Sequence, residues 1–303
     1  MTSKEKWQQN LIHREMKRLR MEDKEKENAI KPPLVSSDVV STGDFVFSPI
    51  KPLDRVGDSG PLLLAKRKNN RSEQYLIKHA YCDCACNEFV YTKLVQAMGY
   101  KMPDIVLFTV SPDEKRRYFK TEYIMGAKYL NIMNESPSYV EIKSNAKNWK
   151  EYFSFRALYA MTGESDSFET PLADDGFIYR VDTTDAFPIS NFILSKAGIN
   201  IEINGVNMKE VCKKQIFNID FSSAWKMDGF DWWLDRFIDK YGQECMAPFL
   251  EPFERIQSIS SEYIDDFLNT LCYFYPDYIG DFYKKYIMAL QQTSCEYLKT
   301  KRV

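Results

Sequence analysis

The chain has 303 residues, a net charge of −2 and a hydrophobic fraction of 44%. This length and composition predict one large globular domain or a pair of smaller ones with a substantial core, and they exclude a fibrous or low-complexity chain. The near-neutral charge gives no reason to expect nucleic acid as an obligate partner.

Residues 1–44 form the first predicted unit. Residues 3–28 are strongly charged, with Trp7, Leu11 and Leu19 near helical spacing, which predicts a solvated helix with a thin apolar stripe. Such a helix is suited to packing on the domain surface or to docking a partner. The Pro- and Ser-containing residues 30–44 are predicted to be a linker.

Residues 45–131 have the pattern of several strands and one helix. Residues 61–80 predict a hairpin whose second strand carries Lys78, and residues 87–100 repeat apolar side chains at helical spacing. Two more strands follow around the turn SPDEKR. The expected order is therefore strand, strand, helix, strand, strand.

From residue 132 to residue 303 the pattern is mostly helical. An amphipathic helix over residues 148–163 is expected to end at Gly163, and an acidic loop then leads to a strand that closes on Asp182. A further helix is predicted over residues 230–238, and two more are joined around Pro276.

The seven cysteines and the hydropathy of the chain bear on its cellular compartment. Three cysteines alternate in YCDCACNEF, a spacing unlike the CxxC pairs of zinc sites, so reduced thiols in a cytoplasmic protein are expected rather than a zinc centre. No segment approaches the ~18 apolar residues of a membrane span, and the N-terminus lacks the apolar centre of a signal peptide, so no membrane association is expected. Delivery into another cell by a specialised secretion system remains compatible with such a sequence.

Several residues of the β-rich region occur in the order that a nucleoside triphosphate site requires. Such an enzyme needs a cation on the phosphates and a carboxylate to hold that cation, and Lys78 and Glu88 are candidates for these two groups. Gly57 and Gly60 lie in a loop between two predicted strands, where they would cover the phosphates. Solvent exposure of Lys78 and a helix-start position for Glu88 are the competing interpretations.

A connector and two carboxylates complete the candidate site. The stretch TEYI, with Glu122, Tyr123 and Ile124, is a candidate connector whose backbone would meet the adenine edge. Asp166, just after a predicted helix, is placed to orient or accept a hydroxyl proton, and Asp182, at a strand end, is placed to coordinate Mg²⁺.

Two other aspartates compete for the metal role. Asp220 also follows an apolar strand pattern, although Asp182 is favoured by its distance from Asp166. Asp185 is a possible neighbouring ligand or a turn-stabilising residue. The alternative without a catalytic role is that Asp166 lies in an acidic surface loop and Asp182 caps the end of a strand.

At this point the chain resembles a known family. YLIKHA, NEFVYTKLVQAMG, FKTEYI, GESDSFE and DDGFIYRVDTTDAF resemble successive landmarks of the protein-kinase-like superfamily. They are most similar to its HipA-like serine/threonine kinases and to the phosphoinositide-kinase-like proteins. The resemblance covers roughly residues 45–295. It implies a two-lobed α+β fold with a β-rich N-lobe over residues 45–131 and a mostly helical C-lobe over residues 132–303.

The resemblance also implies an activity and roles for single residues. The activity is transfer of a phosphoryl group from ATP, with Mg²⁺, to a hydroxyl of a protein or peptide, most simply that of Ser or Thr. Lys78 would contact the phosphates, Glu88 would pair with Lys78, Asp166 would be the catalytic carboxylate and Asp182 would hold the metal.

The departures from the family pattern leave other functions open. Glu164 replaces an Asn, Phe168 replaces a His, and Pro171 stands where a metal-binding Asn is expected. Glu169 or Asp174 are candidates to replace the missing ligand. The alternatives are a nucleotide-binding pseudokinase, a kinase fold with different chemistry such as nucleotidyl transfer or modification of a peptide or metabolite, and a helical interaction module.

Overall fold

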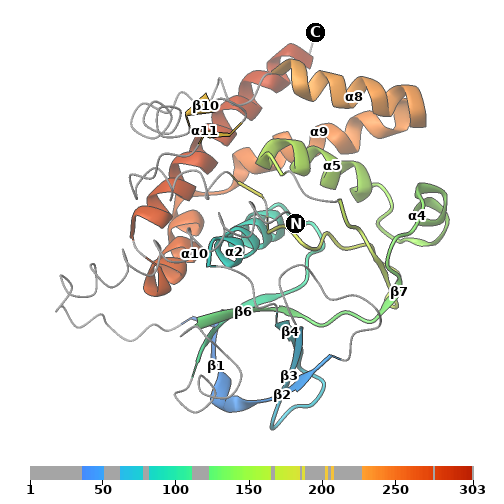
Figure 1. Ribbon diagram of the computed structural model, residues 1–303. Coiled ribbons are helices and arrows are strands. Elements are labelled where there is room, and N and C mark those ends of the chain that lie inside the picture. The colour runs from blue at the N-terminus through green and yellow to red at the C-terminus, as the bar shows by residue number, and fades with distance from the viewer. Residues whose placement is uncertain are drawn as a thin grey trace.

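The structure is a computed structural model with a sheet at one end and a group of helices at the other (Figure 1). It describes residues 36–50, 62–77, 82–110, 123–164, 168–184, 186–187, 202–203, 206–207, 227–275 and 277–301. The predicted α+β class, with a β-rich N-terminal part and a mostly helical C-terminal part, is confirmed. The predicted N-terminal helix over residues 3–28 lies outside the described residues.

The N-terminal part is built on a curled six-stranded sheet. Its strands lie in the order β1-β5-β6-β4-β3-β2, and every neighbouring pair is antiparallel except β1 and β5, which are parallel. The strands are β1 (Val39–Ser41), β2 (Phe45–Pro49), β3 (Leu63–Arg67), β4 (Gln74–Ile77), β5 (Ile105–Thr109) and β6 (Tyr123–Lys128).

Strand β1 corrects the prediction of a linker over residues 30–44. Val39 and Val40 pair in register with Leu107 and Phe108 of β5, so this short segment adds an edge strand to the sheet. A single turn of 3-10 helix, η1 (Thr42–Asp44), then leads into β2. Two valines between turn-forming residues give too short an alternation to predict a strand from sequence.

The two faces of the sheet pack against different partners. Alternation in β2 buries Phe45 and Phe47 and exposes Val46, and the two buried rings meet Phe108 edge to face. On the opposite face, helix α2 (Cys82–Ala97) packs against β5 and β6. The sheet therefore has a small core of its own and shares a larger core with the helices.

Gly126 in β6 is a position where the sheet core tolerates no side chain. A Cβ atom there would lie 2.6 Å from Phe108 and 2.8 Å from Ile77. We expect Gly126→Ala to lower the free energy of unfolding by about 1–3 kcal/mol in urea titrations, because both neighbours are buried side chains. Gly43→Ala, at an exposed site, is the control and should cost less than about 0.5 kcal/mol. Equal effects of the two changes would show that the sheet core relaxes freely around residue 126.

The C-terminal part consists of helices around α5. The longest helix, α11, packs against α9 and α10, and α9 also packs against α5. The helices are α4 (Tyr139–Asn145), α5 (Glu151–Thr162), α8 (Met227–Tyr241), α9 (Met246–Arg255), α10 (Ser261–Phe274) and α11 (Asp277–Lys301). Short elements complete it: strands β7 (Ile132–Asn134), β8 (Leu172–Ala173), β9 (Glu202–Ile203) and β10 (Val206–Asn207), and 3-10 turns η3 (Gln243–Cys245) and η4 (Ile256–Ser258).

Several helix boundaries follow local sequence signals. A capping box between Ser138 and Glu141 opens α4, and Gly163, at φ 66°, closes α5 as predicted. The two helices predicted around Pro276 are α10 and α11. In the described part of the chain, no helix combines the length and apolarity needed to cross a membrane.

Candidate functional site

The candidate site is organised by a hairpin-like segment that follows α5. Isolated bridges join Glu169 to Val181 and Leu172 to Ile178, and the segment turns through Asp174, Asp175 and Gly176. Because Glu169 pairs with Val181, the hairpin brings Glu169 beside Asp182. The turn lies at the other end of the hairpin, so Asp174 is separated from Asp182.

This register places the two candidates for the missing metal ligand differently relative to Asp182. Glu169 is exposed and lies across from the residue before Asp182. Asp174 instead accepts a hydrogen bond from Asn131 at 3.0 Å. Pro171 is buried, and its carbonyl oxygen accepts a hydrogen bond from the Tyr179 amide at 3.2 Å. Pro171 is therefore part of the hairpin framework, and of the two candidates Glu169 is the one whose backbone lies across from the residue before Asp182.

Asp182 has an unusual backbone conformation. Its φ is 56°, and Asp182 and Phe187 are the described non-glycine residues with positive φ. A left-handed residue other than glycine costs about 1–2 kcal/mol, less for Asp and Asn, and such strain concentrates at functional sites. The turn at Asp182 re-aims the chain just after the hairpin and leaves the carboxylate half-buried.

Arg180 fastens the base of the hairpin to the end of α5. Its side chain is fully buried and forms an ion pair with the equally buried Glu164. It also donates to the carbonyl oxygens of Glu169, at 3.1 Å, and of Val181. One guanidinium therefore binds Glu164 and Glu169, which stand before and after residues 165–167 in the sequence, and also Val181, the residue before Asp182. Asp166 belongs to residues 165–167.

Helix α2 is bonded to the chain just beyond Asp182. The Asn87 amide donates to the carbonyl oxygen of Thr184 at 2.8 Å and accepts from the Tyr283 hydroxyl at 2.7 Å. Glu88, the next residue, is 5% exposed and lies in the second turn of the helix. The first-turn position considered for Glu88 is therefore wrong, and the acid is buried in the interior of the molecule instead of favouring a helix start.

Aromatic packing fixes the far end of the same segment. Phe187 meets Tyr283 and Tyr286 edge to face at centroid distances of 5.4 and 5.1 Å. Its amide donates to the carbonyl oxygen of Thr162 at 2.9 Å. The segment 180–187 is thus held by α2, α5 and α11 together, which is the rigid support that a catalytic carboxylate needs.

The predicted connector TEYI is displaced along the chain. Tyr123 and Ile124 are the first residues of β6 and pair with Thr109 and Phe108, so they belong to the sheet. The chain leaves the sheet only after Lys128, through residues 129–131. The sequence misplaced the connector because β6 continues through Gly126 and Ala127, which show no clear strand alternation.

Most other predicted site residues cannot be placed. The following predicted site residues lie outside the described residues: Lys78, Gly57, Gly60, Glu122, Asp166, Asp185 and Asp220. Within the described residues, no group of three or more His, Cys, Asp or Glu side chains could hold a metal ion. Asp182 and Glu169 are still suited in chemistry to Mg²⁺, which prefers oxygen ligands and shares them with substrate phosphates.

Sequence reasoning missed the residues that hold the site together. Arg180, Asn87 and Asn148 had no motif to mark them; Asn148 bonds both backbone groups of Ile178, at 2.9 and 3.0 Å. The useful signal was a polar residue within an apolar run, as at Arg180 in GFIYRVD. A buried polar side chain needs partners, so each such residue predicts a long-range contact.

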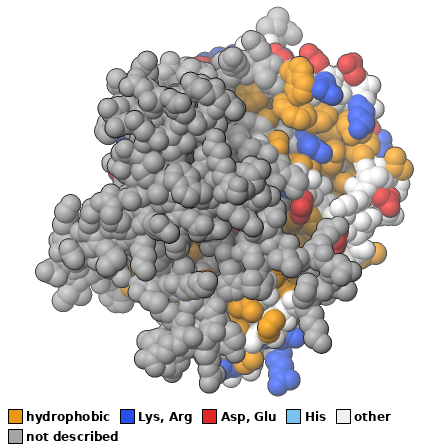
Figure 2. Space-filling model, viewed as in Figure 1, with side chains coloured by type: hydrophobic (Ala, Val, Ile, Leu, Met, Phe, Trp, Pro, Cys, Tyr) orange, Lys and Arg blue, Asp and Glu red, His pale blue; other side chains and the backbone are white. Residues whose placement is uncertain are grey.

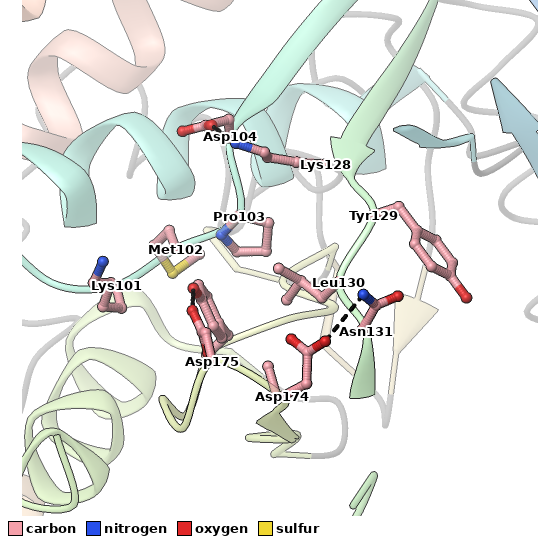
Figure 3. A pocket seen from close by; sticks show the side chains of 12 residues that line it. Lys101, Met102, Pro103, Asp104, Lys128, Tyr129, Leu130, Asn131, Asp174 and Asp175 are labelled. Carbon is pink, nitrogen blue, oxygen red and sulfur yellow. Dashed lines mark hydrogen bonds and ion pairs between the residues drawn. The ribbon is translucent and has the colours of Figure 1, made fainter. Parts of the chain in front are cut away.

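A separate cavity of about 330 Å³ lies beside residues 129–131 (Figure 3). Its polar lining is largely paired within itself, because Lys128 binds Asp104 and Asn131 binds Asp174. The rest of the lining includes Met102, Pro103, Leu130 and Tyr179. Because most of these polar groups already bond to one another, the cavity is a weaker candidate than the Asp182 segment.

Comparisons with known proteins find likeness in structure but none in sequence families. No protein-family model and no curated protein matches the chain. A similar solved structure is that of the Helicobacter pylori proinflammatory kinase CtkA, at 13% sequence identity and a TM-score of 0.40. The likeness covers 85% of this chain and 98% of that one.

Proposed function

We propose that the chain is an ATP- and Mg²⁺-dependent phosphotransferase that acts on a hydroxyl, most simply that of a protein Ser or Thr, in the cytoplasm. The observation that carries the proposal is the left-handed backbone of Asp182 at the end of the hairpin. Glu169 lies on the opposite side of that hairpin, and Arg180 joins the base of the hairpin to Glu164 at the end of α5. Phosphoryl transfer depends mainly on positioning and charge, which is what this rigid arrangement of carboxylates can supply.

The order of elements supports the same proposal. Gly57 and Gly60 stand in the sequence between β2 and β3, Lys78 directly follows β4, and α2 with the buried Glu88 comes next. A phosphate-covering loop, a strand lysine and a helix glutamate occur in this order in protein kinases. Strands β3 and β4 are paired with Leu63 opposite Ile77, so the start of β3 and the end of β4 lie at the same end of the sheet.

Each residue then has a part in the transfer. Lys78 would hold the phosphates of ATP with Glu88 as its partner, and Asp166 would orient the acceptor hydroxyl and take its proton as the oxygen attacks the γ-phosphorus. The bond between the γ-phosphorus and the bridging oxygen would break, and ADP would leave. Asp182 and Glu169 would hold Mg²⁺, which supplies positive charge to the phosphate oxygens. Arg180 would keep these carboxylates in register.

The second candidate function is nucleotide binding without transfer. The observation that favours it is the buried Pro171, which stands where the family pattern has a metal-binding Asn and which cannot ligate through its side chain. In the first proposal Glu169 replaces that ligand. The two candidate functions therefore differ in whether Asp182 and Glu169 together suffice to hold Mg²⁺ for phosphoryl transfer.

Labelled ATP tests the proposal. Purified chain is incubated with γ-labelled or α-labelled ATP and Mg²⁺, with itself and a Ser/Thr peptide array as acceptors. We expect γ label on protein or peptide that Asp166→Ala and Asp182→Ala abolish, because both carboxylates act in the transfer. Asp174→Ala, at the hairpin turn, is the matched control and should keep the activity of the wild type.

The other outcomes identify the alternatives. Transfer of α label would indicate nucleotidyl transfer. No transfer, together with nucleotide-dependent thermal stabilisation that Lys78→Ala removes, would establish a nucleotide-binding pseudokinase, since a ligand that prefers the native state stabilises it. If nucleotide neither labels any acceptor nor stabilises the protein, the kinase-like function is refuted.

A further inference from the structure

Two cations flank a pair of tyrosines where α5 meets α8. Arg156 donates from Nη2 to the Tyr152 hydroxyl at 3.1 Å, and the Nζ atom of Lys240 lies 5.0 Å from the centre of the Tyr241 ring. The two tyrosine rings are 6.4 Å apart between centroids. We call these four residues, together with Phe168, the Arg156–Lys240 surface.

No carboxylate in the described part of the chain forms an ion pair with either cation. The groups that act most on Lys240 are Tyr241, Tyr152 and Arg156, and the hydrogen bond with Tyr241 raises the pKa of Lys240, so it stays charged. The nearby Glu244 is already bound to Lys143. Arg156 lies over the Tyr152 and Phe168 rings and Lys240 over the neighbouring Tyr241 ring. Two like charges on neighbouring rings, without an acid paired to either, attract an anion.

Arg156 also has unused hydrogen-bonding capacity. A guanidinium offers five N–H donors, and one of them is used in the bond to Tyr152. Its Nε atom is buried with no hydrogen-bond partner among the described residues. Charge-assisted bonds from Arg to carboxylate or phosphate oxygens are the strong ones, so an anion would gain most at this residue.

The surface adjoins the proposed catalytic loop. The guanidinium carbon of Arg156 lies 3.6 Å from the centre of the Phe168 ring, and the Tyr152 ring lies 5.8 Å from it. Phe168 comes two residues after Asp166 in the sequence and directly before Glu169. A ligand held by Arg156 would therefore lie next to the residues that flank Asp166.

We propose that the Arg156–Lys240 surface binds a carboxylate or phosphate side chain of a peptide substrate, close to its acceptor hydroxyl. This inference rests on the proposed phosphotransferase function and narrows its substrate class to acidic or previously phosphorylated peptide segments. Arg and Tyr side chains are typical of such recognition, because Arg supplies the positive charge and Tyr supplies a rigid aromatic surface.

The surroundings favour a short acidic peptide over nucleic acid. Lys and Arg side chains stand among hydrophobic ones over the α8 end of the molecule (Figure 2). The same helix also exposes Asp235 and Asp239, and Glu244 follows it. A long phosphate backbone would meet these acids, whereas one anionic side chain would meet only Arg156 and Lys240.

Peptide binding measured by fluorescence anisotropy tests the inference without requiring catalysis. The probe is a fluorescein-labelled peptide with one serine flanked by glutamates, and its comparison peptide carries glutamines instead. We expect the acidic peptide to bind more tightly, and Arg156→Gln and Lys240→Gln each to weaken it about fivefold to tenfold. Lys285→Gln, an exposed lysine of α11, removes the same charge and should leave binding unchanged.

Several outcomes would overturn the inference. These are equal affinity for the two peptides, equal weakening by Lys285→Gln, or tighter binding of a single-stranded oligonucleotide of the same charge. Arg156→Lys should restore part of the affinity if charge is what matters, which guards against a misfolded Arg156→Gln variant. If the acidic peptide binds but no phosphoryl group is transferred, the binding surface is supported and the proposed phosphotransferase function is rejected. If transfer occurs equally to acidic and neutral peptides, the function is supported and the binding surface is rejected.

Discussion

Replacing Arg180 with methionine is expected to lower the free energy of unfolding by about 3–5 kcal/mol, because it removes the guanidinium from a fully buried carboxylate. Methionine fills a similar volume, so the loss would come from charge and hydrogen bonds and not from a cavity. The hydrogen bonds to Glu169 and Val181 would be lost at the same time. Urea unfolding, followed by tryptophan fluorescence, measures the change.

Two further variants isolate the cause. Lys143→Met breaks the exposed pair with Glu244 and should cost less than about 1 kcal/mol, because surface pairs contribute little. The double variant Arg180→Met with Glu164→Met should recover part of the loss, because it leaves neither charge of the buried pair without its partner. If the double variant is as unstable as the single one, the hairpin bonds and not the buried pair dominate.

The order of elements could be predicted from the sequence because it depends on local signals. Apolar periodicity predicted α8, α10 and α11, and Gly163 marked the end of α5. These features depend on residues a few positions apart. The α+β division into a strand-rich and a helix-rich part followed from the same patterns.

Features that depend on pairing between distant residues could not be predicted. Strand β1 is specified by its partner β5, about seventy positions away, and not by its own three residues. The different positions of Glu169 and Asp174 relative to Asp182 depend on the register of the hairpin. Arg180 finds its partner Glu164 sixteen residues earlier; the apolar run around Arg180 indicates burial, but no local pattern identifies that partner.

A substitution series at Asp182 is expected to separate catalysis from conformation. Asp182→Gly should reduce phosphoryl transfer at least about hundredfold, because a metal-binding carboxylate is worth several kcal/mol in the transition state. The same variant should keep its stability or gain up to about 1 kcal/mol, because glycine adopts the observed φ of 56° without strain. Initial rates with γ-labelled ATP and urea unfolding measure the two effects.

Asp182→Ala and Asp182→Asn complete the series. Alanine should lose the same activity and also destabilise the protein by about 1 kcal/mol, because it lacks the short polar side chain whose local hydrogen bonds let Asp and Asn adopt the left-handed conformation. Asparagine tolerates that conformation and should leave stability unchanged while activity still falls. A glycine variant that keeps its transfer activity would mean that Asp182 serves the turn alone. Since Asp182 would then hold no metal, the two-carboxylate site with Glu169 would have to be abandoned with it.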